Sequence, residues 1–436
     1  MDRRDLRRQL GRPLRAHLRP HRHRRLGAHR RGRRSRAARG ARRPLRRRVS
    51  VGDDPTPITP AALAERPLLF ASGELAYVAD GVRRTWSTPD GADPGWAEEV
   101  RAVLAPGERA LVALSFAAGA PGLAHVVTGA ERTLRRHPVE AVERRYEVTE
   151  FPTPEQYAGM VEAALDKIAA GDLHKVVLGR CLDVVSTPSL VPAEIIDRLL
   201  TTRPGRYVFS VPLVAGTADG ATPLDGPILV GASPELLVRR SGREISCTPL
   251  AGSVPRSDDP TEDARRADGL RDSAKDLAEH AFVVEAIVRA LEDVCVEIEH
   301  PATPELMSTD TVWHLATPIR ARLADGTEGP SALRLAQLLH PTPAVGGVPT
   351  AAANAVIADL EGDLRDWFAG CVGWVDAVGD GEFAITIRAA VLDGERLRLF
   401  AGAGIVAGSD PAAEVRETGA KLTTMARVTG FTPPGG

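Results

Sequence analysis

The stretch RLRLFAGAGIVAGSDPAAEVRETGAKL (residues 396–422) joins a strand pattern to a helix pattern. The apolar run at 396–406 predicts a buried strand, and in the helix that follows Glu414, Glu417 and Lys421 share one face, because they are spaced i, i+3, i+7. These charges are either a solvated helix face or part of a site. Glycines between a strand and a helix favour a site, since they let backbone N–H groups approach an anion.

Outward from this stretch, short strand-like runs cluster and are interrupted by a few longer helix patterns. Apolar runs predict strands at 110–119, 174–185, 206–214, 227–233, 235–250 and 382–393. Apolar periodicity and capping residues predict helices at 95–105, 153–170, 260–294, 331–339 and 350–369. This arrangement is typical of an α+β or mixed α/β domain.

The composition describes a chain with ample material for a core. It has 436 residues, of which 43% are hydrophobic, and no uncharged apolar run reaches the roughly 18 residues of a membrane span. Its four cysteines are scattered without a CxxC pair, which argues against a zinc site or a disulfide framework. We therefore expect a cytoplasmic protein without a membrane partner.

The net charge of −1 conceals a strongly basic N-terminus. Residues 1–50 contain 21 Arg, no Lys and two acids, a charge of +19, so the remainder carries −20. This segment is a misannotated upstream extension, a disordered arm or a targeting segment, and its lack of apolar periodicity favours the first. Residues 51–66 are Pro-rich and form a predicted linker. The acidic remainder argues against nucleic acid as the main partner.

Lysine is rare in this chain, which has only Lys167, Lys175, Lys275 and Lys421. A lysine kept against such a bias suggests a need for a point charge or a removable proton, because Arg does not deprotonate in proteins. Lys175 opens the apolar strand HKVVLGR. It is either a lysine at a sheet edge or a general base in a closed pocket.

Two further acids have the setting of functional groups. Glu235 follows Ser-Pro in GASPELLV, where a turn meets a strand, and a desolvated Glu there could donate a proton. Glu279 lies four residues after Lys275 and could form an exposed ion pair with it. Alternatively, Glu279 could join the acids of the opening stretch in binding a hard divalent cation.

Nine motifs in order make the chain similar to the chorismate-utilising enzymes, and most similar to their isochorismate synthase branch. They are HKVVLGR, GASPELLV, PLAGS, KDLAEH, WHLATP, HPTPAVGG, TIRAA, LFAGAGI and ExxETxxK, at 174–180, 231–238, 249–253, 275–280, 313–318, 340–347, 386–390, 399–405 and 414–421. The resemblance covers 67–430, with the motifs in 151–430. It implies one α+β chorismate-binding domain, with a large antiparallel β-sheet sandwich surrounded by helices.

The resemblance also implies a reaction, the reversible Mg²⁺-dependent conversion of chorismate to isochorismate by an isomerase (hydroxymutase). Lys175 would activate the water that attacks C2, and Glu235 would protonate the departing C4 hydroxyl. Glu279 and Glu417 would hold Mg²⁺, with Glu414 nearby. The residues that the resemblance places around the substrate are Gly252, His314, Ala344, Val345, Arg388, Gly402 and Lys421.

The branch of the family depends on two positions. Ammonia-using anthranilate and aminodeoxychorismate synthases usually lack the base lysine, and the latter often carry Lys where this chain has Ala251. Lys175 and Ala251 thus favour water as nucleophile, and we expect a monomer that needs no glutamine amidotransferase subunit. Salicylate synthase, which also eliminates pyruvate, stays the main alternative, and an anthranilate or aminodeoxychorismate synthase component is a less favoured one. The sequence does not decide whether the product would be used in menaquinone or in siderophore synthesis.

Overall fold

The computed structural model describes residues 68–430, except 74, 134–141, 203–206, 215–225, 310–311 and 325–328. All of these described residues belong to one compact unit, Asp54–Gly436. The predicted N-terminal extension at 1–50 and the predicted linker at 51–66 lie outside the described residues.

Strands dominate the described part of the chain. They are β1 (Leu69–Ser72), β2 (Leu75–Thr88), β3 (Arg109–Leu114), β4 (Gly122–Thr133), β5 (Arg145–Phe151), β6 (Lys175–Thr187), β7 (Tyr207–Pro212), β8 (Ile228–Ser233), β9 (Leu236–Ser241), β10 (Glu244–Thr248), β11 (Leu250–Pro255), β12 (Cys295–Glu299), β13 (Glu305–Ser308), β14 (Val312–Ala316), β15 (Ile319–Leu323), β16 (Gly347–Val348), β17 (Cys371–Asp376), β18 (Gly381–Ile385), β19 (Ala389–Asp393) and β20 (Arg396–Val406).

The helices lie between these strands and after the last of them. They are α2 (Pro94–Ala102), α3 (Pro154–Ala170), α4 (Pro192–Thr202), α5 (Pro260–Asp272), α6 (Ala274–Glu292), α7 (Ala332–Leu339), α8 (Thr350–Glu361) and α9 (Pro411–Thr429). Within the residues that the structure describes, no helix is both long and apolar enough to cross a membrane.

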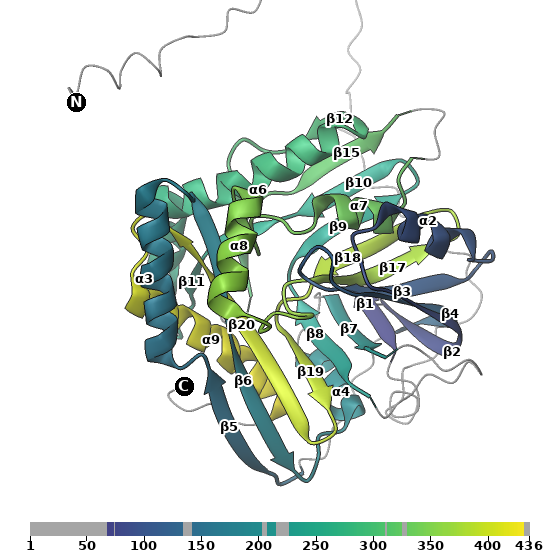
Figure 1. Cartoon of the computed structure of the whole chain (residues 1–436), viewed down its shortest axis with the longest axis horizontal. Helices are drawn as coiled ribbons and strands as arrows, with labels where there is room; N and C mark the ends of the chain where they lie inside the picture. The colour runs from purple at the N-terminus through teal and green to yellow at the C-terminus, as the bar shows by residue number, and fades with distance from the viewer. Residues whose placement is uncertain are drawn as a thin grey trace, which may run out of the picture. The chain divides into compact units, whose positions relative to one another are not determined.

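One antiparallel sheet of 17 strands forms the frame of the domain (Figure 1). Neighbouring strands pair in the order β12-β15-β10-β9-β18-β17-β3-β4-β2-β1-β7-β8-β19-β20-β6-β5, and β16 pairs with the start of β6. Buried side chains from β3 and β17 share a core cluster with those from β7 and β8, so these parts of the sheet face each other. The predicted antiparallel sandwich is confirmed.

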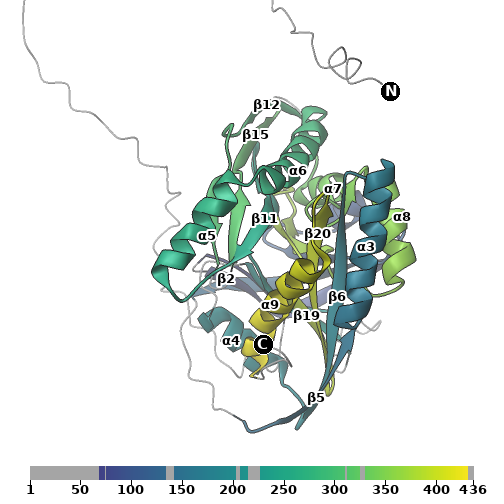
Figure 2. The ribbon, with the colours of Figure 1, turned by 90° about the vertical axis from the view of Figure 1, so that its left-hand side faces the viewer.

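A second, three-stranded sheet and the helices surround this frame. The small sheet has the order β11-β14-β13, and α5 and α6 pack on it. Helix α9 packs along β20 with α3 beside it, and α8 packs on β6 (Figure 2). Strand β20 also contacts α6, and its pairing with β6 runs over the whole strand from Arg396 to Val406.

Local signals at helix α3 agree with the structure. Thr153 is the N-cap, and its side chain and that of Gln156 form a reciprocal capping box. Gly171 ends the helix with a φ of 86°, a left-handed conformation that glycine adopts at little cost.

Two predicted helices are shorter than their patterns indicated. The helix predicted at 260–294 is two helices, because Ser273 is extended and its hydroxyl accepts a hydrogen bond from the Asp276 N–H at 3.2 Å. This side-chain cap offers the backbone an alternative to continuing the helix. The helix predicted at 350–369 ends at Glu361, because Gly362 has a φ of 59°.

Two predicted strands are also interrupted. The run 235–250 forms the β9–β10 hairpin, which turns at Gly242 with a φ of 60°. The run 382–393 is split into β18 and β19, and Arg388 between them has a left-handed φ of 52°. A side chain with a Cβ rarely adopts this conformation, so Arg388 is held there by its surroundings.

A buried ion pair ties α8 to the frame. Arg365 Nε lies 2.8 Å from Glu361 Oε2, and both side chains are almost fully buried. The guanidinium also donates to the carbonyls of Val345 at 2.6 Å and Val177 at 2.5 Å, while the Gly179 N–H donates to Glu361 Oε1 at 2.7 Å. The pair therefore fixes β6 relative to the segment that contains Val345.

We expect Arg365→Met to lower the free energy of unfolding by about 3–5 kcal/mol, because Glu361 is left as a buried, unpaired charge. Urea denaturation measures this loss. The double variant Glu361→Leu/Arg365→Met should recover part of it. If the double variant is no more stable than Arg365→Met, the unpaired charge is not the cause of the loss.

Candidate active site

A cavity of about 400 Å³ opens where the small sheet, α5, α6 and α9 meet β20 and the turn between β8 and β9. Eleven of the twelve residues that the sequence singled out line this cavity. They are Glu235, Gly252, Glu279, His314, Ala344, Val345, Arg388, Gly402, Glu414, Glu417 and Lys421. The twelfth, Lys175, lies directly behind the wall. The fold thus brings together residues as far apart in the chain as Lys175 and Lys421, which are separated by 246 positions.

Lys175 is the first residue of β6 and is fully buried. Its Nζ lies 2.9 Å from Glu279 Oε1, and Glu279 itself is buried on α6. Strand β6 pairs with β20 on one side and with β16 near Lys175, so this lysine does not occupy an open sheet edge. Both simple alternatives, the sheet-edge lysine and the exposed Lys275–Glu279 pair, are wrong.

Gly404 makes room for this pair, although its sequence motif did not single it out. A Cβ at Gly404 would lie 2.2 Å from Glu279 Oε1 and 3.2 Å from Lys175 Cε. Gly402 and Gly404 are two residues apart on β20, so both face the same side of the sheet. The GxG spacing on a predicted strand was the signal that could have identified Gly404.

Glu235 sits between β8 and β9 and is 3% exposed. Burial raises the pKa of its carboxyl group to about 8, although the weak hydrogen bond from the Leu250 N–H and the charge of Lys175 both act to lower it. The predicted desolvated glutamate is confirmed, and at neutral pH its carboxyl group carries a proton that it can donate.

Helix α9 contributes the charges of the opening stretch. Lys421 Nζ lies 2.5 Å from Glu417 Oε1 and donates to the Gly402 carbonyl at 2.9 Å. Glu414 is 3% exposed, and burial and the charge of Glu417 raise the pKa of its carboxyl group. The solvated helix face is therefore wrong for these residues, which point into the cavity.

Three of the four lysines in the chain each pair with one carboxylate of this site. The pairs are Lys175–Glu279, Lys275–Glu414 and Lys421–Glu417. Lys275 and its neighbour Asp276 also line the cavity, although neither was selected as a site residue. The scarcity of lysine was the available signal for Lys275.

The carboxylates also bear on the expected Mg²⁺. Within the described ranges, no group of three or more His, Cys, Asp or Glu side chains is gathered closely enough to form a complete metal site. Mg²⁺ usually binds one or two protein carboxylates and completes its octahedron with water and substrate oxygens. Glu279, Glu414 and Glu417 in one cavity fit that donor chemistry.

Backbone and ring groups complete the walls. Gly252 on β11 has a φ of 75°, and a Cβ there would lie 3.0 Å from Asp276 Cβ. His314 on β14 shares a 2.7 Å hydrogen bond with the Ser253 hydroxyl, which holds its ring at the wall. His340 lies outside the lining and shares a 2.9 Å hydrogen bond with the Ala369 carbonyl, so it supports the wall from behind.

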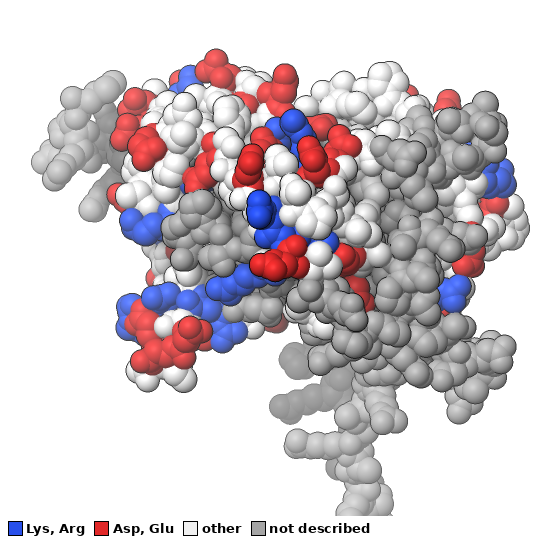
Figure 3. All heavy atoms as spheres, turned by 90° about the horizontal axis from the view of Figure 1, so that it is seen from below, with Lys and Arg blue, Asp and Glu red and all other residues white. Residues whose placement is uncertain are grey.

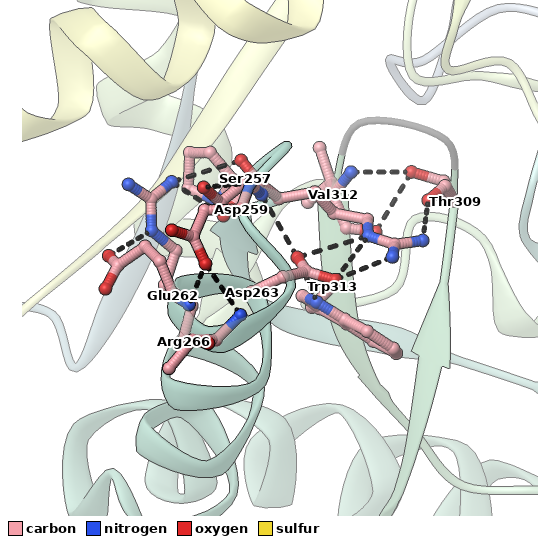
Figure 4. A network of polar contacts seen from close by, with 11 residues as sticks. Ser257, Asp259, Glu262, Asp263, Arg266, Thr309, Val312 and Trp313 are labelled. Carbon is pink, nitrogen blue, oxygen red and sulfur yellow. Dashed lines mark hydrogen bonds and ion pairs between the residues drawn. The ribbon is translucent and has the colours of Figure 1, made fainter.

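Helix α5 closes one side of the cavity with Arg265, Arg266 and Leu270. Figure 4 shows the polar network that holds it. Asp263 accepts hydrogen bonds from Trp313 Nε1 at 2.9 Å, from the Ser257 N–H at 3.0 Å and from Arg256 at 2.6 Å. Since Trp313 precedes His314 on β14, the network links α5 to the part of the cavity wall that His314 forms.

The outer surface carries charges of both signs. On the face in Figure 3, the Lys and Arg side chains of the described residues are interspersed with Asp and Glu side chains. A mixed face of this kind does not favour a phosphate backbone. The expectation that nucleic acid is not a main partner stays a prediction.

Comparisons with known proteins agree with this geometry. Residues 123–430 match the family model described as chorismate binding enzyme. Isochorismate synthase DhbC of Bacillus subtilis (strain 168) is 45% identical over 285 residues, 65% of this chain and 70% of the relative. Isochorismate synthase EntC of Escherichia coli (strain K12) is 43% identical over 302 residues, 69% of this chain and 73% of the relative.

A solved structure supports the fold. The crystal structure of a protein designated DhbC from Bacillus anthracis is similar with a TM-score of 0.76 and 37% sequence identity. The similarity covers 84% of this chain and 96% of that protein.

The pKa of Glu235 predicts a pH-dependent stability. Because this pKa is raised from 4.5 to about 8, the folded chain binds one more proton than the unfolded chain between these values. Stability from Glu235 is complete below pH 4.5 and is lost as the pH rises towards 8. In Glu235→Gln, the free energy of unfolding should therefore fall less steeply between pH 4.5 and 8 than in the wild type. Urea unfolding at several pH values measures this. A decline as steep as that of the wild type would contradict the raised pKa.

Proposed function

The chain belongs to the chorismate binding enzyme family and to its isochorismate synthase group, and we propose that it converts chorismate reversibly into isochorismate with Mg²⁺. Enzymes of this group are isomerases (hydroxymutases). One observation carries the proposal: a buried lysine directly behind the cavity wall and a buried glutamate on that wall, whose pKa burial raises to about 8, come from different elements, β6 and the β8–β9 turn.

In the proposed reaction Lys175 releases its ammonium proton to solvent and then takes a proton from water as the water oxygen bonds to C2. The ring double bonds shift, the bond from C4 to its hydroxyl breaks, and Glu235 donates the proton with which that group leaves as water. Glu235 then regains a proton from solvent, and since one water enters and one leaves, the net change is an isomerisation. In the reverse direction the two residues exchange roles.

The remaining wall residues hold the substrate in the proposal. Chorismate is a dianion, and Lys421 and Arg388 supply cations at the cavity, which backbone groups of Gly252 and Gly402 also line. Ala344 and Val345 line the ring pocket, and His314 supports it. The ion pair of Arg365 fixes the Val345 carbonyl and so this part of the wall.

Glu279 and Glu417 would hold Mg²⁺, with Glu414 beside them. When bound, this ion supplies positive charge that offsets the ring carboxylate of the substrate. Because water rather than ammonia is the proposed nucleophile, the chain would need no glutamine amidotransferase subunit. We further propose that it acts as a monomer.

Product analysis tests the reaction. Purified protein incubated with chorismate and Mg²⁺ should give isochorismate, separated by chromatography. Salicylate together with pyruvate would identify a salicylate synthase instead. Anthranilate formed only when ammonia is added would overturn the choice of water as nucleophile.

Variants of Lys175 test the base. Lys175→Ala should lower turnover by about 10²-fold or more, the usual contribution of a general base, while chorismate still binds. Lys175→Arg should be equally inactive, because it keeps the charge but cannot lose a proton. Lys167→Ala, on α3 and away from the cavity, is the control. Turnover near that of the wild type in Lys175→Ala would refute the assignment.

A further inference from the structure

Lys275 is a cation of the site to which the proposed reaction assigns no role. It lines the cavity, and its Nζ lies 3.3 Å from Glu414 Oε1. Its side chain is 37% exposed, whereas those of Lys175 and Lys421 are 0% and 13% exposed. Of the three paired lysines, Lys275 is therefore the one whose ammonium group can move into water without displacing its neighbours.

The position of Lys275 at the start of α6 indicates that its charge serves groups outside the helix. Lys275 is the second residue of α6, where the positive end of the helix dipole disfavours a cation. The Glu414 carboxylate, 3.3 Å from Nζ, supplies the negative charge that offsets this cost. The carboxylates of the site, not the helix, thus account for a cation here.

A lysine rather than an arginine at position 275 fits an ion pair with Glu414 that must be able to break. The chain has 56 basic residues, of which only four are lysines, so Arg is the usual cation. An arginine could bind Glu414 through two parallel hydrogen bonds, whereas lysine offers a compact point charge on a flexible stem. Lysine therefore gives the weaker and more easily broken pair.

The acids on α9 need a counter-charge whenever no divalent cation is present. Glu414 and Glu417 lie one helical turn apart on α9, so their charges repel, and the Lys275 ammonium group 3.3 Å from Glu414 opposes this repulsion. Lys421 already binds Glu417, so Lys275 is what offsets Glu414. We propose that Lys275 is a built-in counter-cation, which holds Glu414 in the metal-free enzyme and gives it up when a divalent cation binds. This inference rests on the proposed Mg²⁺ site.

Metal binding to the full chain tests the exchange. Isothermal titration of the metal-free protein with Mg²⁺ alone should show that Lys275→Gln binds about two- to fivefold more tightly than the wild type, because a partly exposed ion pair no longer competes. Lys275→Arg should bind Mg²⁺ no more tightly than the wild type. Lys167→Gln, a lysine outside the cavity, should not change the affinity. An unchanged or weaker affinity in Lys275→Gln would overturn the proposal.

Thermal unfolding without metal separates this inference from the Mg²⁺ proposal. Lys275→Gln should unfold at a lower temperature than the wild type, and this difference should vanish in a Glu414→Gln background, where the repulsion is removed. If no variant binds Mg²⁺, the metal proposal and the exchange both fail. Equal unfolding temperatures of Lys275→Gln and the wild type would separately refute the counter-cation.

Discussion

The ion pair between Lys175 and Glu279 imposes a constraint that much of the structure satisfies. Both groups are removed from water, and a buried charge is tolerated only when an opposite charge meets it closely, here at 2.9 Å. The pair brings the start of β6 against α6, and β20 between them carries Gly404, where any Cβ would collide with the carboxylate. The position of the helix, the strand pairing and the glycine therefore depend on one another.

The same principle organises the rest of the cavity. Glu235 forms no ion pair with any described residue and stays protonated, because burial outweighs the charge of Lys175 and raises its pKa to about 8. Glu414 and Glu417 stay close together because lysines from α6 and α9 offset them. The environment thus makes one glutamate of the cavity a proton donor and leaves the others as charged groups. Acid–base chemistry on a dianion requires both kinds of group.

Much of the fold followed from local patterns, and the failures have local causes. Apolar runs and caps identified α3 and the strands β6 and β20. The helix at 260–294 was predicted too long because its apolar stripe continues across Ser273, whose hydroxyl ends one helix and caps the next. Site residues were found mainly through ordered motifs. Gly404 and Lys275 were missed, because nothing adjacent to them in sequence shows that they meet Glu279 and Glu414.

By itself, the sequence determined the α+β class, the family and the residue types of the site, because these depend on local spacing and ordered motifs. It left open whether Glu414, Glu417 and Lys421 face water and whether Lys175 lies at a sheet edge. Only the tertiary structure decided these points. Charge state and pairing depend on burial and on partners from distant segments, such as Lys175 and Glu279, and no local pattern contains either quantity.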